Sequence, residues 1–213
     1  MGLAVIFLVL SYFIGSIPFG LIIGKLSGKD LRAHGSGNIG STNAVRTLGV
    51  KLGALSALCD VTKGALIIII IKLLEHYGVW QNPIIINGES IYTVYGLMAV
   101  IGHCYPVYLK FKGGKAVATS LGALLVTLPL TAIVALVIFA IALKISGYVS
   151  LSSTFSTFGV LLTCFTLYTF VFNQFYNCLF VIGFAILIFI RHIPNYKRLL
   201  NGTEHNFKKK KAL

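Results

Sequence analysis

The sequence has few charged residues, and this scarcity excludes most classes of soluble protein. Only 11% of its 213 residues are charged, whereas 57% are hydrophobic. A soluble domain has about 25% charged and about 45–50% apolar residues, so this chain lacks the charge to cover a water-facing surface. The composition argues against a soluble enzyme, a DNA-binding domain and a disordered protein. It predicts an integral membrane protein.

Acidic residues are scarcer still, with 5 Asp and Glu against 18 Lys and Arg and a formal net charge of +13. In a soluble chain this excess would suggest a nucleic-acid partner. In a membrane protein it has two better explanations, namely basic cytoplasmic loops and loops that bind an anionic substrate. We therefore expect no nucleic-acid partner.

The chain also lacks the cysteine spacing of a metal site or a disulfide framework. It contains no C-x-x-C pair, and each cysteine lies in or beside an apolar run; the four are Cys59, Cys104, Cys164 and Cys178. We interpret them as buried apolar side chains and expect no metal and no cofactor. The N-terminus lacks a positive n-region and an A-x-A site, so its apolar run is predicted to stay in the protein.

Seven apolar segments are predicted to cross the membrane, since a span needs about 20 apolar residues. One apolar stretch is too long for a single helix, and Pro129 divides it because proline removes a helical hydrogen bond. The predicted spans are Leu3–Gly24, Leu52–Leu74, Ile91–Leu109, Gly114–Leu128, Leu130–Ile145, Val149–Val171 and Phe175–Arg191. The sequence thus predicts an all-α integral membrane protein with one transmembrane domain over residues 1–213, two short helices broken at Pro129, and a basic tail from about residue 199.

The distribution of Lys and Arg predicts the orientation of these spans. In the seven-span arrangement, the connections Glu75–Ser90 and Phe172–Gln174 and the turn at Pro129 contain no basic residue. All the basic loops fall on the other side, which the positive-inside rule assigns to the cytoplasm. We therefore expect the N-terminus outside and the C-terminus in the cytoplasm. Without the break at Pro129, Lys144 would lie outside, so the distribution favours the break.

The first basic loop is rich in glycine and small polar residues. Residues Gly35–Arg46 read GSGNIGSTNAVR and contain G-x-G-x-x-G, but the pattern follows a membrane span rather than a strand, which argues against a dinucleotide site. Glycines still allow backbone N–H groups to converge on an anion, and a helix N-terminus adds a favourable dipole. Arg46 would add a planar charged group suited to phosphate. The alternative is a glycine-rich turn before an interfacial helix.

The second basic loop, Gly102–Ala116, reads GHCYPVYLKFKGGKA. Lys112 and Lys115 flank a Gly-Gly pair, an arrangement that predicts an anion-binding nest. A positive-inside loop would explain the lysines but not the glycines. His103 alone is more typical of a structural hydrogen-bonding residue.

Two further features stay open from the residues alone. Ser150, at the start of the sixth span, and Arg191–Arg198, after the seventh, add polar groups to the same face, although interfacial Arg and Tyr are ordinary anchors. Asp60 and Lys63 form an i,i+3 pair inside the second span. Ionisable residues there are functional candidates, but we favour a mutually neutralising pair that braces the loops.

Together these polar groups suit a water-soluble anion and a lipidic partner that meet at one membrane face. A membrane carrier for a phosphorylated small molecule is the alternative, but a carrier would place its polar residues near mid-membrane.

Several motifs resemble those of the bacterial acyl-phosphate:glycerol-3-phosphate acyltransferases, the PlsY family. They are Ser36–Arg46 (SGNIGSTNAVR), Gly102–Thr119 (GHCYPVYLKFKGGKAVAT), Asp60-x-x-Lys63-Gly64, and Ser150 with Arg191–Arg198, Gly202 and Glu204. The resemblance covers nearly the whole chain. It implies that the acyl group of a fatty acyl phosphate moves to the sn-1 hydroxyl of glycerol 3-phosphate, giving lysophosphatidic acid and inorganic phosphate in the first acylation of phospholipid synthesis.

The resemblance also implies site residues and a location. It implies catalytic roles for Ser36, Lys112, His192 and Asn195, and substrate-binding roles for Arg46, Gly37, Asn38, Gly113, Gly114, Lys115, Ser150, His103 and Glu204. The general base is left open between His192 and the substrate phosphate. Ser41 replaces the usual alanine, and Ala116 replaces the usual glycine. We expect a bacterial plasma (inner) membrane protein whose active site faces the cytoplasm, without an obligate protein partner.

Overall fold

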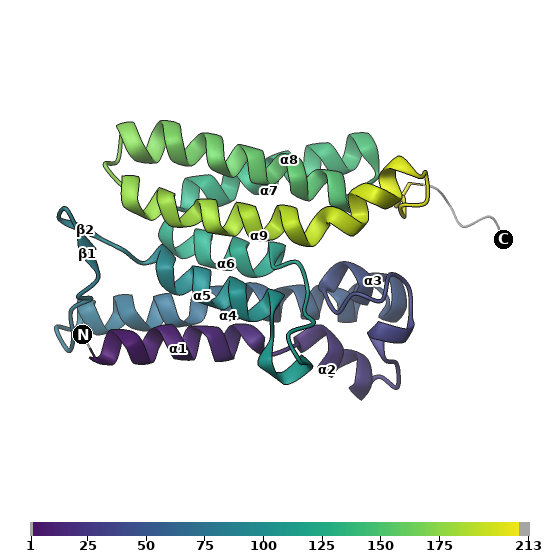
Figure 1. The fold of residues 1–213 in the computed structure, drawn as a ribbon, viewed down its shortest axis with the longest axis horizontal. Coiled ribbons are helices and arrows are strands. Elements are labelled where there is room, and N and C mark those ends of the chain that lie inside the picture. Colours follow the sequence, from purple (N-terminus) through teal and green to yellow (C-terminus); the bar gives the residue numbers. More distant parts are fainter. Residues whose placement is uncertain (1, 209–213) are drawn as a thin grey trace.

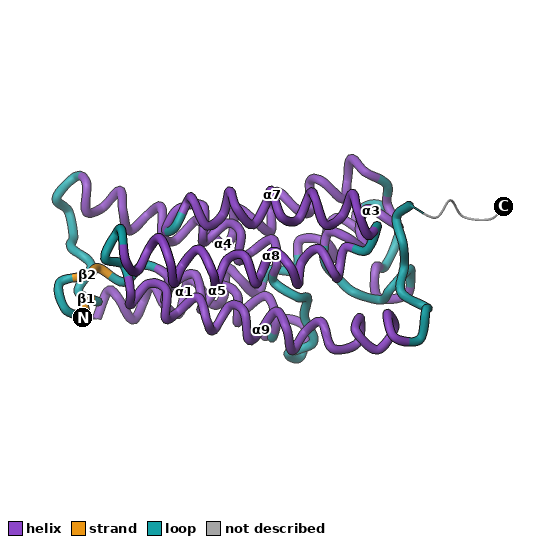
Figure 2. The backbone as a smooth tube through the Cα atoms, turned by 90° about the horizontal axis from the view of Figure 1, so that it is seen from above, coloured by secondary structure: helices purple, strands orange, loops and turns teal. Residues whose placement is uncertain are grey.

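Residues 2–208 are described by the computed structural model as a bundle of helices along the long axis of the molecule (Figures 1 and 2). The α-helices are α1 (Gly2–Ser16), α2 (Phe19–Leu26), α3 (Ser41–Leu48), α4 (Val50–His76), α5 (Thr93–Cys104), α6 (Val117–Thr127), α7 (Pro129–Ser146), α8 (Val149–Thr163) and α9 (Phe175–Leu200). Between α4 and α5, β1 (Ile85–Ile86) pairs antiparallel with β2 (Glu89–Ser90). Short 3-10 helices lie at Leu31–Ala33 and Val107–Leu109, and a π-helical turn, Cys164–Tyr168, follows α8. The N-terminus and the hairpin lie at one end, and α3 and the end of α9 at the other (Figure 1).

The all-α architecture confirms the predicted fold class. Within residues 2–208, five helical segments are long and apolar enough to cross a membrane: Gly2–Leu26, Val50–His76, Pro129–Ser146, Val149–Tyr168 and Phe175–Leu200. The two shorter apolar segments, Thr93–Leu109 and Val117–Thr127, correspond to the third and fourth predicted spans. The count of seven spans and their orientation stay predictions.

Prolines mark three of the helix breaks in the described chain. The break at Pro129 is confirmed, because α7 begins with this proline in its first turn, where a missing N–H carries no penalty. The first predicted span, Leu3–Gly24, corresponds to the segment Gly2–Leu26, within which Pro18 separates α1 from α2. The third, Ile91–Leu109, ends as an α-helix at Cys104, before Pro106.

The last helix departs from its predicted end. The seventh span was expected to end at Arg191, but α9 continues through Pro194 to Leu200. The segment Arg191–Arg198 is therefore part of a regular helix, so that residues three or four positions apart share one face. Residues 199–208 of the predicted tail lie within the described part of the chain, and Lys209–Lys211 lie outside it.

The short helices α5 and α6 create room inside the bundle. With 12 and 11 residues, they rise only about 16–18 Å at 1.5 Å per residue, against about 30 Å of hydrocarbon. Their connection, residues 105–116, therefore begins and ends within the bundle, with Pro106, Gly114 and Ala116 buried, while its middle is exposed. It carries Lys115 to the cavities described below.

Glycines bring α4 and α6 into close contact. A Cβ on Gly64 would lie 2.0 Å from the carbonyl oxygen of Thr119, and one on Gly122 would lie 1.9 Å from that of Val61. Small residues at such contacts let membrane helices pack closely, since burial of apolar surface from water drives no association within lipid. The approach places α4 and α6 side by side along one wall of the cavity.

A buried ion pair braces the break between α1 and α2. Lys63 Nζ lies 2.8 Å from Asp60 Oδ1, with both side chains at most 3% exposed, and it donates to the carbonyl oxygen of Ile17 at 2.8 Å. Ile17 directly precedes Pro18, where the helix is interrupted. The favoured interpretation of this pair as a brace is confirmed.

Candidate functional site

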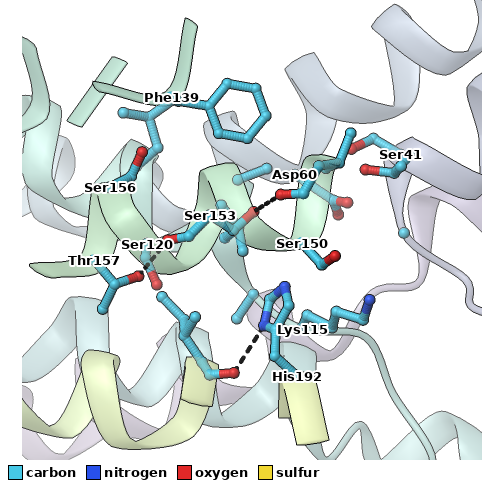
Figure 3. Close-up of a pocket in the computed structure, with 18 of the residues that line it drawn as sticks. Ser41, Asp60, Lys115, Ser120, Phe139, Ser150, Ser153, Ser156, Thr157 and His192 are labelled. Atoms are coloured by element: carbon cyan, nitrogen blue, oxygen red, sulfur yellow. Dashed lines mark hydrogen bonds between the residues drawn. The ribbon is translucent and has the colours of Figure 1, made fainter. Parts of the chain in front are cut away.

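A cavity of about 280 Å³ lies among α3, α4, α6, α7, α8 and α9, and Figure 3 shows part of its lining. Its polar lining includes Ser36, Asn38, Arg46, Asp60, His103, Lys115, Ser150, His192, Asn195 and Glu204. Its apolar lining includes Leu121, Leu124, Leu136, Phe139, Val160, Phe184 and Ile188. We call it the amphipathic cavity because it joins a charged region to an apolar one.

A second cavity of about 280 Å³ adjoins the first and is lined by three basic side chains, those of Lys115, Arg191 and Arg198. We call it the cationic cavity. Gly37, Ile190 and Pro194 also line it. It shares Ser36, Asn38, Lys115 and Asn195 with the amphipathic cavity, and we call these four residues the shared wall. A ligand with an anionic group and an apolar chain would fit across this wall.

Asn43 holds the glycine-rich loop in shape. Its Nδ2 donates to the carbonyl oxygens of Leu31 at 3.0 Å, His34 at 3.0 Å and Asn38 at 2.8 Å. Its Oδ1 accepts from the backbone N–H of Ser36 at 2.9 Å, and its side chain is buried. Because the loop itself uses the hydrogen-bonding groups of Asn43, this side chain is structural.

The predicted residues of this loop lie where a ligand could reach them. Ser36 and Asn38 belong to the shared wall, and Gly37 lines the cationic cavity. Gly37 has φ +71°, in the left-handed region that favours glycine. Ser41, which departs from the family pattern, begins α3 and lines the amphipathic cavity, so the helix N-terminus faces that cavity.

Arg46 presents a half-buried guanidinium to the amphipathic cavity. Its Nε is buried and lacks a hydrogen-bond partner within residues 2–208. Its Cζ lies 5.2 Å from the ring centroid of Phe207. Burial lowers the pKa of Arg46, and the nearby carboxylate of Glu204 partly offsets that effect. The side chain is thus held in place with one donor free for an anionic ligand.

The predicted anion nest at Gly113-Gly114 is not formed. The N–H of Gly113 donates to Cys104 O at 3.2 Å, and that of Gly114 donates to His103 O at 3.0 Å. Both glycine carbonyls accept from the Arg191 guanidinium, with Nε 2.8 Å from Gly114 O. Glycine is required here for packing, since a Cβ on Gly114 would lie 2.1 Å from His103 Nε2. The nest was wrong because neighbouring carbonyls already occupy both donors.

The two lysines of this loop lie in different surroundings. Lys115 is part of the shared wall, and burial lowers its pKa to about 8, with nearby Glu204 opposing the shift and Arg198 adding to it. Lys112 is exposed, and among the described residues it is absent from the lining of both cavities. The structure therefore brings Lys115 to the site but not Lys112, whose catalytic role stays a prediction.

Ala116 occupies a position suited to glycine. Its φ of 58° and ψ of 13° lie in the left-handed helical region, which a Cβ makes unfavourable. The backbone conformation at the start of α6 is therefore a sufficient reason for the glycine that is usual in the family at this position.

His192 is oriented by its neighbours and lines the amphipathic cavity (Figure 3). Its Nδ1 lies 2.8 Å from the carbonyl oxygen of Ile188. Because a carbonyl only accepts, Nδ1 carries the proton and Nε2 carries the lone pair. The ring also stacks on Tyr196 at a centroid distance of 6.2 Å.

Glu204 joins three segments at the polar end of the cavity. Its Oε1 accepts from Ser150 Oγ at 3.0 Å and from Asn195 Nδ2 at 2.7 Å. Its Oε2 lies 2.7 Å from Arg198 Nε. Burial raises the pKa of Glu204, but the hydrogen bonds from Asn195 and Arg198 outweigh burial and hold the pKa below its ordinary value. Asn195 Oδ1 is left buried without a hydrogen-bond partner in the described chain.

His103 combines a structural position with access to the cavity. Its Nδ1 lies 3.6 Å from Asp60 Oδ1, and its ring packs over Gly114. Both His103 and Asp60 line the amphipathic cavity. The structure thus places His103 between the buried brace and the loop that carries Lys115.

Three residues that the sequence analysis did not place in the site also line the cavities. The sequence left the role of Arg191 and Arg198 open. With Pro194 and Asn195 they have the i, i+3, i+4, i+7 spacing of one helix face. That spacing would have grouped them had the helix been extended past Pro194. Ser120 lines the amphipathic cavity one residue beyond the motif that ended at Thr119.

Comparisons with known proteins point to one enzyme family. Residues 5–202 match the family described as glycerol-3-phosphate acyltransferase. A glycerol-3-phosphate acyltransferase of Desulfotalea psychrophila is 43% identical over 206 residues, which cover 96% of this chain and 98% of that protein. Another from Bacillus subtilis is 40% identical over 207 residues, covering 97% and 98%.

Solved structures lead to the same family. A crystal structure of PlsY (YgiH), an integral membrane glycerol 3-phosphate acyltransferase in its glycerol 3-phosphate form, superposes with a TM-score of 0.81 at 37% identity. The match covers 96% of this chain and 95% of that one. The lysophosphatidic acid form of PlsY gives a TM-score of 0.79 at 36% identity, covering 95% and 94%. With matches that extend over nearly its whole length, the chain belongs to the glycerol-3-phosphate acyltransferase family.

Proposed function

We propose that this protein transfers the acyl group of a fatty acyl phosphate to the sn-1 hydroxyl of glycerol 3-phosphate. The products are lysophosphatidic acid and inorganic phosphate, in the first acylation of phospholipid synthesis. The similarity to PlsY structures in glycerol 3-phosphate and lysophosphatidic acid forms supports the acceptor and the product. The choice of acyl phosphate as donor rests on the motif resemblance.

The single observation that carries the proposal is the pair of cavities with a shared wall. The cationic cavity has Lys115, Arg191 and Arg198 to hold the phosphate of glycerol 3-phosphate. The amphipathic cavity offers Arg46 to the donor phosphate and an apolar lining to its chain, where each buried CH₂ contributes about 0.8 kcal/mol. The two substrates then meet at Ser36, Asn38, Lys115 and Asn195.

In the proposed reaction, the glycerol hydroxyl oxygen attacks the acyl carbonyl carbon. An ester C–O bond forms, the anhydride C–O bond breaks, and its electron pair leaves with phosphate. His192 Nε2 bears a lone pair on the cavity side and accepts the hydroxyl proton. The mixed anhydride is already activated, so a covalent acyl-enzyme is unnecessary. The chain's main tasks are to position two anions and offset their repulsion.

Glu204 acts through other residues in this scheme. By holding Asn195 Nδ2 and Ser150 Oγ, it fixes a carboxamide and a hydroxyl beside the donor phosphate. Gly113 and Gly114 position Lys115 through their packing on His103. Lys112 would join the site only through a movement of the loop it occupies.

The proposed membrane arrangement follows the distribution of basic residues. Seven spans would leave the N-terminus outside and the C-terminus in the cytoplasm, with the cavities opening toward the cytoplasmic face of a bacterial plasma membrane. The two ends of the described chain lie at opposite ends of the bundle (Figure 1), which supports an odd number of crossings.

The decisive experiment mixes the purified protein with palmitoyl phosphate and glycerol 3-phosphate and follows phosphate and lysophosphatidic acid together. We expect equal yields of both, absent when glycerol 3-phosphate is left out. Palmitoyl-CoA serves as the comparison donor and is expected to be inactive. Counterflow of glycerol 3-phosphate in vesicles without any acyl donor, with no acyl transfer from either donor, would instead support a carrier.

A further inference from the structure

Ser120 carries a buried hydroxyl that faces the amphipathic cavity without a partner. It is 3% exposed, it lines the cavity, and its Oγ makes no hydrogen bond within residues 2–208. A serine inside a helix usually donates to the carbonyl four residues earlier. An unpaired buried donor is unfavourable in the free protein, so its presence points to an acceptor supplied by a ligand.

Three other hydroxyls in the cavity lining are already occupied. Ser153 donates to Val149 O at 2.9 Å, and Thr157 donates to Ser153 O at 2.8 Å. Ser156 donates to Ala135 O at 2.8 Å. These three donors are used by the helices themselves. Ser120 differs from them in having its donor free.

Ser120 lies at the boundary between the charged and the apolar parts of the cavity. On α6 it follows Lys115 by five positions and precedes Leu124 by four, and Leu124 lies about 6 Å deeper along the helix. On α9, His192 lies between Asn195 and Phe184 in the same way. Figure 3 shows Ser120 and His192 among the side chains that line this cavity.

An acyl phosphate has its own boundary at the carbonyl group, between the anionic phosphate and the apolar chain. With the donor phosphate at Arg46, beside the shared wall, and the chain along Leu124, the carbonyl oxygen lies at the level of Ser120. That oxygen is the acceptor which the chain itself does not provide.

Resting on the proposed function, we propose that Ser120 Oγ–H donates a hydrogen bond to the acyl carbonyl oxygen of the donor. As the glycerol oxygen bonds to the carbonyl carbon, the carbonyl π electrons move onto this oxygen, and they return when the phosphate leaves. The hydroxyl of Ser120 keeps its proton throughout. Because the oxygen is most negative in the transition state, the bond is strongest there.

The test compares Ser120→Ala with Ser152→Ala, whose buried hydroxyl donates to Tyr148 O at 2.8 Å and which lines neither cavity. We expect Ser120→Ala to lower kcat by about 10²–10³-fold, as loss of one oxyanion donor does, with little change in KM. Ser152→Ala should keep kcat close to that of the wild type. Ser120→Thr retains a hydroxyl and should recover most of the lost activity.

A second measurement separates carbonyl recognition from cavity shape. Hexadecyl phosphate has the phosphate and the chain but lacks the carbonyl, so its inhibition constant should be the same for Ser120→Ala and for the wild type. A matching rise in that constant would overturn the assignment. The thermal midpoint of Ser120→Ala should not fall, because the hydroxyl makes no bond in the free protein, and a clear fall would also overturn it.

Failure of this inference can be told from failure of the proposed function. If the wild type forms no lysophosphatidic acid from palmitoyl phosphate, the proposed function is wrong, and the inference is overturned with it. If the wild type is active and Ser120→Ala equals it, only the role of Ser120 is wrong.

Discussion

Replacing Glu204 with glutamine tests whether the polar end of the cavity depends on one carboxylate. Glu204 accepts hydrogen bonds from Ser150, Asn195 and Arg198 at 3.0, 2.7 and 2.7 Å. Glutamine keeps the shape and one oxygen. Its NH₂ group would face the guanidinium of Arg198, which also only donates. The change therefore removes one acceptor and the negative charge while preserving volume.

The expected loss of stability follows from these bonds. A hydrogen bond to a charged group contributes about 1.5–3 kcal/mol, and a neutral one about 0.5–1.5 kcal/mol, so the bonds from Ser150 and Asn195 each weaken by about 1 kcal/mol. The pair with Arg198 contributes about 1 kcal/mol at most, since the arginine side chain is 37% exposed. A total of about 2–3 kcal/mol corresponds to a fall of about 4–10 °C in the thermal midpoint.

Activity should fall as well, because Asn195 loses its fixed orientation. Losing about 1–2 kcal/mol of transition-state contact lowers kcat/KM by about 5–30-fold. The matched control is Glu89→Gln at the hairpin, where the carboxylate accepts from Tyr176 N and from Asn177 N and Nδ2. That variant should lose similar stability and keep its kcat/KM.

The pH dependence of the thermal midpoint tests whether the charge of Glu204 causes this loss of stability. Since the folded pKa of Glu204 lies below its ordinary value of 4.5, its contribution is present above about pH 4.5 and is lost as pH falls through the lowered pKa. The difference in thermal midpoint between wild type and Glu204→Gln should therefore shrink below pH 4.5. A difference that is constant down to the lowest accessible pH, or unchanged kcat/KM with a lowered midpoint, would refute the reasoning.

Four further predictions concern the loop and the buried brace. Because the pKa of Lys115 is about 8, its ammonium group loses its charge as pH increases through 8, and the KM for glycerol 3-phosphate should rise. Lys115→Arg should flatten this rise. A pH profile of KM that the substitution leaves unchanged would exclude Lys115 as its source. Lys112→Ala is expected to lower turnover by about 10–150-fold. Because the Lys112 side chain is exposed, this effect requires its loop to move toward the substrates. Near-wild-type turnover would remove Lys112 from the site. Ala116→Gly should raise the thermal midpoint by about 1–4 °C. Glycine adopts the left-handed backbone without strain, and this gain exceeds the opposing effect of the entropy that glycine adds to the unfolded chain. Asp60→Asn leaves Lys63 buried and unpaired and should cost about 3–5 kcal/mol, and adding Lys63→Met should restore much of it.

The membrane bundle could be predicted because its determinants are local. Runs of apolar residues give the helices, and Pro129 gives the break between α6 and α7. Pro18 and Pro106 also interrupt or end helices, but the prediction gave more weight to the apolar runs in which they lie. Pro194 shows the limit of this signal, since α9 continues through it.

The site could be predicted in its composition but not in its hydrogen bonding. Ser36, Asn38, Arg46, Lys115, His192 and Asn195 do line the cavities as their motifs suggested. Whether a donor is free depends on partners far along the chain. The N–H groups of Gly113 and Gly114 are taken by carbonyls nine to eleven residues earlier. Ser120 has a free hydroxyl because its helix does not use it, which sequence spacing alone does not reveal.

Glu204 follows the last of the described helices, yet it fixes Ser150 at the start of α8 and Asn195 within α9. Since a chain is synthesised from its N-terminus, this carboxylate leaves the ribosome after every described helix. The polar end of the cavity is therefore completed last. A nascent chain would be inserted and largely packed while still inactive, and catalysis would begin only when the turn after α9 folds back.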